Sequence, residues 1–132
     1  MYLKEDNNMT IAFYCVVIGL LIPIILAGIS KRNIEVHYDN ESPRDHIAHL
    51  SGKAKNAYNA EQNHYETFPM FAIAVLTAHW LNHDQAIIDL LAIIFIFARV
   101  LHATFYLTNN GSLRSLSYLV GLACTIALFF AG

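Results

Sequence analysis

The chain has 132 residues, of which 56% are hydrophobic and only 14% are charged. Soluble domains contain about a quarter charged residues, so this composition indicates a membrane protein, and the length indicates a single domain. The formal net charge of −2 excludes the basic surface that nucleic-acid-binding proteins need. Cys15 and Cys124 lie within apolar stretches, where we expect them to be buried free thiols.

Four stretches are long enough to cross a bilayer as helices. The first, residues 10–29, is uncharged, and about twenty helical residues reach about 30 Å. A cleaved signal peptide is the alternative, but the length, the lack of an A-x-A site and the similar segments that follow favour a span. Further spans are expected at about residues 56–81, 85–107 and 113–131. Short turns make neighbouring spans antiparallel, so we expect an all-α, integral membrane four-helix up-down bundle that forms one domain over residues 1–132.

The basic residues predict how this bundle is oriented. Most of them fall in the loop of residues 30–55 and in the turn before the last span: Lys31, Arg32, Arg44, Lys53, Lys55 and Arg114. The opposite end has only Lys4. By the positive-inside rule, these two connections are cytoplasmic and both termini face away from the cytoplasm, in the cytoplasmic membrane if the source is a bacterium.

The second span opens with the polar sequence NAEQNHYETFP, in which Asn59, Asn63 and Glu66 share one helical face. Pro69 cannot donate to the carbonyl of Tyr65, which predicts a free oxygen and a kink. A polar helix end that only meets lipid headgroups is the alternative. It suits Asn59 better than Glu66, because the sequence turns apolar directly after Glu66.

In the third span Arg99, His102 and Tyr106 also share one face. An arginine at this depth in a span costs a few kcal/mol on insertion scales, so it is expected to point into the bundle and to find a partner. Glu66 lies at a similar depth, and a Glu66–Arg99 ion pair is therefore predicted. Such a pair would fix the helix register whether or not it has a further role.

The fourth span begins with NNGSLRSLSY, in which Ser112 is predicted to be the N-cap. Arg114 and Ser115 then lie in the first turn, and Tyr118 lies one turn later on the side of Arg114. An arginine at a helix N-terminus provides a site for an anion, although a lone arginine could instead be a topology anchor. Together the three clusters predict a cytoplasmic-side site where a polar, anionic small molecule meets an apolar one from the lipid.

Three motifs in order, NHYETFP, RVLHATFY and LRSLSY, resemble the MAPEG family, the membrane-associated proteins in eicosanoid and glutathione metabolism. The resemblance implies a homotrimer that binds glutathione between subunits near the cytosolic face. It implies that Asn63 and Glu66 hold the glutathione backbone and that Arg114 stabilises the thiolate, with Ser115 beside it. Lining residues of the same pocket would be Arg99, His102, Tyr106 and Tyr118.

The sequence departs from the family pattern at two positions in the second span. Asn59 stands where many members carry an arginine that grips a glutathione carboxylate, and Gln62 stands where some members carry another basic residue. Lys55 lies one turn before Asn59 and is a candidate substitute. Both Asn59 and Gln62 are kept among the expected glutathione-binding residues.

These observations predict a membrane-bound glutathione transferase or peroxidase that acts on lipophilic electrophiles or hydroperoxides. One alternative is a non-catalytic member that serves as a binding or assembly partner, which the substitution at Asn59 keeps open. The other is a small four-span transporter; such transporters carry their working glutamate in the first span, which here has no charge. No metal site is expected, since the histidines of the first loop are read as solvated.

Overall fold

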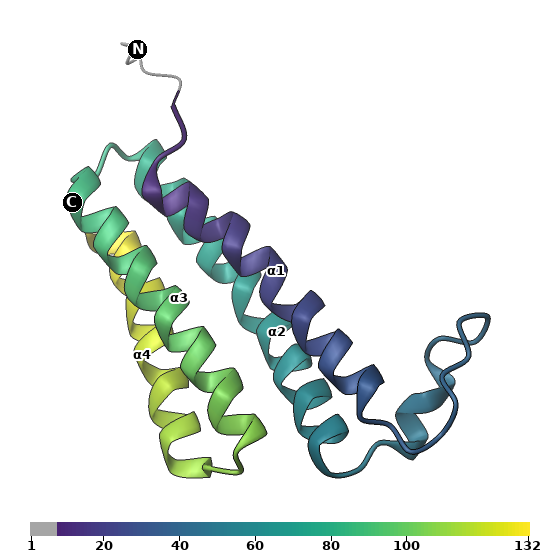
Figure 1. The fold of residues 1–132 in the computed structure, drawn as a ribbon. Coiled ribbons are helices and arrows are strands. Elements are labelled where there is room, and N and C mark those ends of the chain that lie inside the picture. Colours follow the sequence, from purple (N-terminus) through teal and green to yellow (C-terminus); the bar gives the residue numbers. More distant parts are fainter. Residues whose placement is uncertain (1–7) are drawn as a thin grey trace.

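The computed structural model describes residues 8–132, which fold into four long antiparallel helices (Figure 1). They are α1 (Ile11–Arg32), α2 (Gly52–Trp80), α3 (Gln85–Leu107) and α4 (Gly111–Phe130), and the first loop carries a short 3-10 helix, η1 (Asp45–His49). The described residues contain no strand. The predicted all-α up-down bundle is therefore confirmed, whereas its assembly into a trimer stays a prediction.

The helix starts differ from the predicted boundaries at two places. α2 begins at Gly52, earlier than expected, so its first turns carry the polar residues that were assigned to the loop. α4 begins at Gly111, and the side chain of Asn110 accepts a hydrogen bond from the backbone N–H of Leu113 at 3.1 Å. The prediction that Ser112 caps this helix was wrong, because the asparagine two residues earlier already takes the capping position.

Three of the helices are long and apolar enough to cross a membrane: α1, α3 and α4. α2 has 29 residues, but polar side chains occupy much of its first half, and it does not reach the same hydropathy within the described residues. Large apolar side chains cover the outer surface of α1, including Ile24 and Ile25, which are more than half exposed. Such a surface is suited to lipid rather than water.

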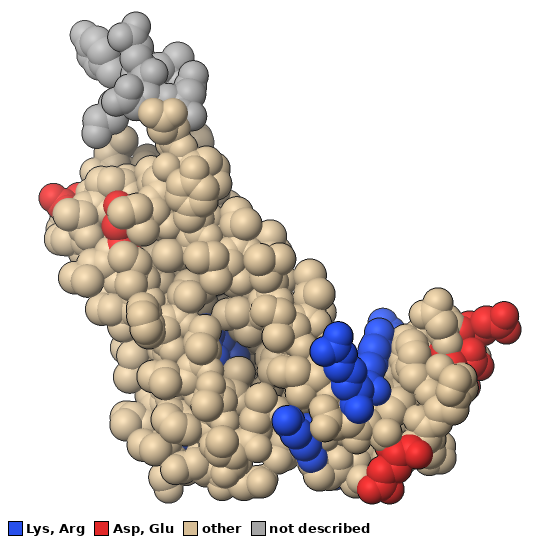
Figure 2. All heavy atoms as spheres, in the orientation of Figure 1, with Lys and Arg blue, Asp and Glu red and all other residues tan. Residues whose placement is uncertain are grey.

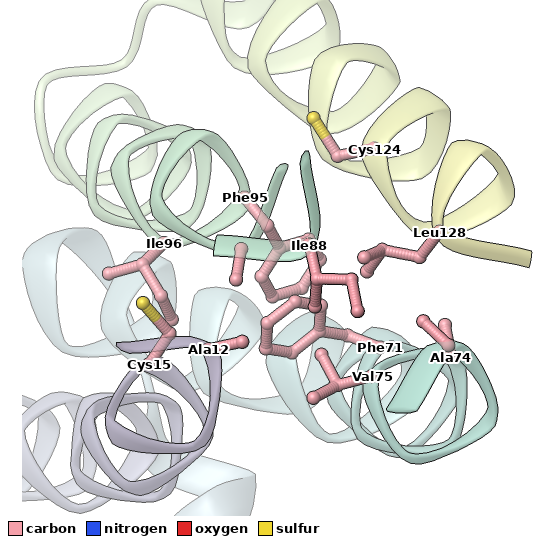
Figure 3. Packing of buried hydrophobic residues seen from close by; sticks show 12 residues of the cluster. Ala12, Cys15, Phe71, Ala74, Val75, Ile88, Phe95, Ile96, Cys124 and Leu128 are labelled. Carbon is pink, nitrogen blue, oxygen red and sulfur yellow. The ribbon is translucent and has the colours of Figure 1, made fainter. Parts of the chain in front are cut away.

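The helices form two hairpins, α1–α2 and α3–α4, which lie against each other through three helix pairs, α2 with α3, α1 with α3 and α2 with α4 (Figure 1). At the centre, the rings of Phe71 and Phe95 stack with centroids 3.8 Å apart and planes 6° apart (Figure 3). Alanines, including Ala74, Ala78 and Ala92, are fully buried around them and let the helix backbones approach closely. Cys15 and Cys124 are buried and free, as predicted.

Hydrogen bonds between helices fix the end of the bundle where α1 begins. The carboxylate of Asp89 on α3 accepts the backbone N–H of Ala12 at 2.9 Å. On α2, His79 bonds through Nδ1 to the carbonyl of Val75 and through Nε2 to the hydroxyl of Thr10, at 2.8 and 3.0 Å. The opposite end, toward the first loop, contains the polar residues that the sequence singled out.

Candidate functional site

Six of the predicted site residues line one cavity of about 360 Å³. The cavity lies between α2, α3 and α4, and its polar lining residues are Asn63, His102, Tyr106, Arg114, Ser115 and Tyr118. α3 and α4 contribute most of the residues predicted to share their faces, whereas from α2 only Asn63 lines this cavity, and Asn59 and Glu66 do not. The clusters of the three predicted spans therefore meet at one place in a single chain.

Arg114 is the cation of this cavity. It lies in the first turn of α4, where its own backbone N–H bonds to the carbonyl of Asn110 at 3.0 Å, and its guanidinium carbon lies 4.5 Å from the ring centroid of Tyr106. This contact is a cation–π interaction, which holds the side chain without neutralising it. No carboxylate forms an ion pair with Arg114 anywhere in residues 8–132, so its charge is available to an anion.

His102 forms the inner wall of the cavity. Its ring lies edge-on to Tyr106, with centroids 5.2 Å apart, and 6.4 Å from the ring of Tyr118. The side chain is 3% exposed, and its Nδ1 has no hydrogen-bond partner among the described residues. A buried nitrogen without a partner costs free energy, so this ring contributes to the cavity wall at a cost to the stability of the single chain.

A second cavity of about 240 Å³ adjoins the first and shares Tyr118 with it. Its polar residues include Glu66 and Arg99, and its apolar residues include Met70, Phe95 and Leu122. Gly121 belongs to the same wall, where a Cβ would lie 3.6 Å from the ring of Phe95. The lining of the first cavity is mostly polar, and the lining of the second combines two charged side chains with apolar ones.

The predicted ion pair between Glu66 and Arg99 does not form within the described residues. Arg99 is 2% exposed and donates from Nη2 to Oδ1 of Asn63 at 2.8 Å and from Nε to Nδ1 of His64 at 3.3 Å. Glu66 lies on the exposed side of α2 instead. Asn63 and His64 supply the acceptors that the guanidinium contacts, whereas Glu66, although it lines the same cavity as Arg99, accepts no hydrogen bond from it.

His64 is a residue that the sequence reasoning missed. It is 1% exposed, and its Nε2 lies 2.7 Å from the carbonyl oxygen of Gly19 on α1. The signal was present in the sequence: Pro23 lacks the N–H that would bond to the carbonyl four residues earlier, which is that of Gly19. α2 runs through Pro69 as one continuous helix.

Asn59 and Gln62 lie outside the two cavities. Asn59 is half-buried and lines neither of them. Gln62 lines a separate cavity of about 490 Å³ beneath the first loop, together with Glu61, Lys31 and Arg44. In a single chain these two residues are therefore not brought to Arg114, and their role in binding stays a prediction. Lys55 is exposed at the start of α2.

The sequence of this chain matches a known protein family. A model described as "MAPEG family" matches residues 11–132, which is nearly the whole chain. The chain belongs to the MAPEG family. No curated protein sequence matches it with significant similarity.

Membership of the MAPEG family confirms the resemblance drawn from the three motifs, and it confirms a helical membrane protein. The family includes glutathione transferases and enzymes of eicosanoid metabolism, and also members that are not glutathione transferases. Membership alone therefore supports a function of this general kind.

Proposed function

We propose that this MAPEG protein is a membrane-bound glutathione-dependent transferase or peroxidase. It would conjugate lipophilic electrophiles or reduce lipophilic hydroperoxides. The observation that carries the proposal is the position of Arg114. This arginine stands at the N-terminus of α4, lines a cavity with Asn63 and His102, and has no carboxylate partner in residues 8–132.

The residues around the two cavities fit the chemical groups of glutathione. Activated glutathione has two carboxylates, one ammonium group and one thiolate, and in the cavities Glu66 can pair with the ammonium group, Arg99 with one carboxylate and Arg114 with the thiolate. Oδ1 of Asn63 is engaged by Arg99, so its amide N–H₂ remains as a donor for a ligand carbonyl. The signs and the hydrogen-bonding groups are complementary.

Arg114 would activate the thiol. A thiol with a pKa of about 8.5 is mostly protonated at neutral pH, and the thiolate is the nucleophile. A guanidinium and the free N–H groups of a helix N-terminus both favour the negative sulfur. Ser115, in the same turn, provides a hydroxyl donor beside it, and Tyr118 provides a second one where the two cavities meet.

The lipophilic substrate would lie in the apolar part of the second cavity. Met70, Phe95 and Leu122 line that part, and Tyr118 separates it from the cavity that contains Arg114. In the transferase reaction the sulfur would form a bond to an electrophilic carbon while the leaving group departs with the electron pair. In the peroxidase reaction two thiols are oxidised to a disulfide, and the hydroperoxide is reduced to an alcohol and water.

The charge distribution supports a site that opens toward the cytoplasm. Lys and Arg side chains gather where α1 ends and the first loop begins, while the opposite end of the described structure shows only acidic groups (Figure 2). Lys4 lies outside the described residues. By the positive-inside rule the loop faces the cytoplasm and both termini face away from it. A homotrimer with the site between subunits belongs to the same proposal, since it rests on the family resemblance.

A non-catalytic binding or assembly protein is the second candidate. Two observations favour it: the family contains members that are not glutathione transferases, and Asn59 replaces the arginine found in many members. Under this candidate the cavities would bind glutathione weakly or not at all. No turnover would be found with any electrophile.

The experiment that separates these candidates is a turnover assay on detergent-purified protein. Glutathione would be supplied with a chloronitrobenzene electrophile and, separately, with an organic hydroperoxide. We expect Arg114→Ala to abolish turnover, while Lys53→Ala, which removes an exposed cation in the first turn of α2, leaves it unchanged. Full activity of Arg114→Ala, with its oligomeric state intact, would contradict the role given to Arg114.

A further inference from the structure

A backbone oxygen in the middle of α1 lacks a hydrogen-bond donor from its own helix. Pro23 is buried within this helix and has no N–H, so the carbonyl of Gly19 lacks its usual intrahelical donor. A carbonyl left free within a membrane must be bonded by another group, and neighbouring helices commonly supply it. Here the donor comes from α2, where Nε2 of His64 lies 2.7 Å from that oxygen.

The two neighbours of His64 determine which of its ring nitrogens carries the proton. A carbonyl oxygen only accepts, so Nε2 must carry the hydrogen that bonds to Gly19. A guanidinium only donates, so Nδ1 must be the unprotonated nitrogen that accepts Nε–H of Arg99 at 3.3 Å. Both contacts therefore require the same neutral tautomer. A doubly protonated ring could not accept the bond from Arg99.

The imidazole is held in place by packing as well as by hydrogen bonds. Its ring stacks on Phe68, with centroids 5.5 Å apart and planes 20° apart. Phe68 in turn lies against Gly19, where an added Cβ would overlap the ring edge. The absence of a side chain at Gly19 thus lets α1 and α2 approach closely enough for His64 to reach the carbonyl.

Arg99 is then fixed at two points. His64 takes its Nε–H and Asn63 takes a hydrogen of Nη2, while the guanidinium also lines the second cavity with Glu66. With both bonds made on the α2 side, the remaining N–H groups are left to serve that cavity. The plane and the height of the guanidinium are therefore set by a side chain that lines neither cavity itself.

We propose that His64 is a positioning residue for Arg99, and that His64 is itself held by the Gly19 carbonyl that Pro23 leaves free. A chain of contacts thus links α1, through α2, to the arginine of α3 at the binding site. The proposal rests on the proposed function only for the identity of the ligand. Pro23 and His64 do not line the two cavities, yet under this proposal both help to position a residue of the binding site.

Nitrogen NMR of protein labelled at histidine tests the tautomer without any ligand. We expect His64 to show a protonated Nε2 and an unprotonated Nδ1, as a single species. A protonated Nδ1, or a doubly protonated ring, would overturn the proposal. In Pro23→Ala the new N–H shares the Gly19 carbonyl and weakens its bond to His64, so the Nε2 resonance of His64 should shift, while the bond from Arg99 keeps Nδ1 unprotonated. An unchanged His64 spectrum in that variant would refute the part given to Pro23.

Glutathione affinity then tests whether the positioning matters. His64→Phe keeps a ring against Phe68 but removes both bonds, and we expect on the order of tenfold weaker binding. His64→Asn, whose Oδ1 can replace the Nδ1 acceptor, should recover part of the loss. His79→Phe is the matched control, since it removes a bonded histidine of α2 at the far end of the bundle. Wild-type affinity in His64→Phe would overturn the proposal.

The proposed function and this inference can fail separately. If the wild-type protein bound no glutathione, the proposed function would fail, and the position of Arg99 would be judged from its own Nε–H resonance. That resonance should shift in His64→Phe and stay in place in His79→Phe. An unshifted Arg99 resonance in His64→Phe would refute the positioning role whatever the ligand is.

Discussion

Asn63 accepts a hydrogen bond from Nη2 of Arg99 at 2.8 Å, and this amide, not the carboxylate of Glu66, meets the buried guanidinium. A guanidinium that is 2% exposed and has no carboxylate partner in residues 8–132 is costly within a membrane. Part of that cost is offset by hydrogen bonds to neutral groups. The remaining positive charge favours an anion in the adjoining cavity.

Substitutions at Asn63 should separate stability from ligand binding. Asn63→Ala leaves Nη2 of Arg99 buried without its acceptor, and we expect a loss of about 1–3 kcal/mol in unfolding free energy. Asn63→Asp keeps the acceptor and adds a counter-charge, so stability should be retained, but the amide donor is lost and an anionic ligand is repelled. Thermal unfolding in detergent and glutathione titration measure the two effects. Equal affinity in Asn63→Asp and wild type would contradict the placement of the ligand.

Glu66→Gln should lower the affinity for glutathione and leave the unfolding free energy almost unchanged. The side chain is exposed on α2 and makes no ion pair within the described residues, so its stability effect should stay within about 0.5 kcal/mol. The glutathione ammonium group would lose its anionic partner, so affinity should fall several-fold. A loss of several kcal/mol in stability would instead indicate that Glu66 and Arg99 form the ion pair that the structure lacks.

Gly19→Ala tests the close approach of α1 and α2. The added methyl would overlap the ring of Phe68, and crowding of this kind costs about 1–3 kcal/mol. Gly28→Ala, in the same helix, is the matched control, because a Cβ there meets nothing within 4 Å. Chemical or thermal unfolding should show a lower unfolding free energy for Gly19→Ala than for Gly28→Ala. Equal stability would show that α1 and α2 are not packed tightly at Gly19.

The capping of α4 provides a test that distinguishes Asn110 from Ser112. Asn110→Ala removes the acceptor for the N–H of Leu113 and should destabilise the protein by about 1 kcal/mol. Ser112→Ala should have almost no effect, because Ser112 is exposed and is already within the helix. Because the same turn carries Arg114, Asn110→Ala should also weaken anion binding. If Ser112→Ala destabilised the protein more than Asn110→Ala does, Ser112 would be the N-cap of α4.

The sequence was sufficient for the features that depend on spacing along one helix. The bounds of α3 match the prediction, and the common face of Arg99, His102 and Tyr106 turns inward. The convergence of α2, α3 and α4 on one cavity follows from the same periodicity combined with short turns. Such features are local, so they can be read before the helices are packed.

Features that depend on how one helix meets another were not predicted. Spacing placed Glu66 and Arg99 at one depth, but it did not reveal that Asn63 and His64 reach the guanidinium first. Likewise the bond from His64 to Gly19 depends on a close approach between α1 and α2. Pro23 predicts that the carbonyl of Gly19 has no donor from its own helix, but the sequence does not indicate which residue bonds to that carbonyl.

A titration can show whether Arg114 holds glutathione as a thiolate. Glutathione is added to detergent-purified protein while the ultraviolet absorbance of the thiolate is followed, with Arg114→Ala measured in parallel. We predict a saturable thiolate signal in the wild-type protein that is lost in the variant. No signal at millimolar glutathione, or the same signal in both proteins, would contradict the account.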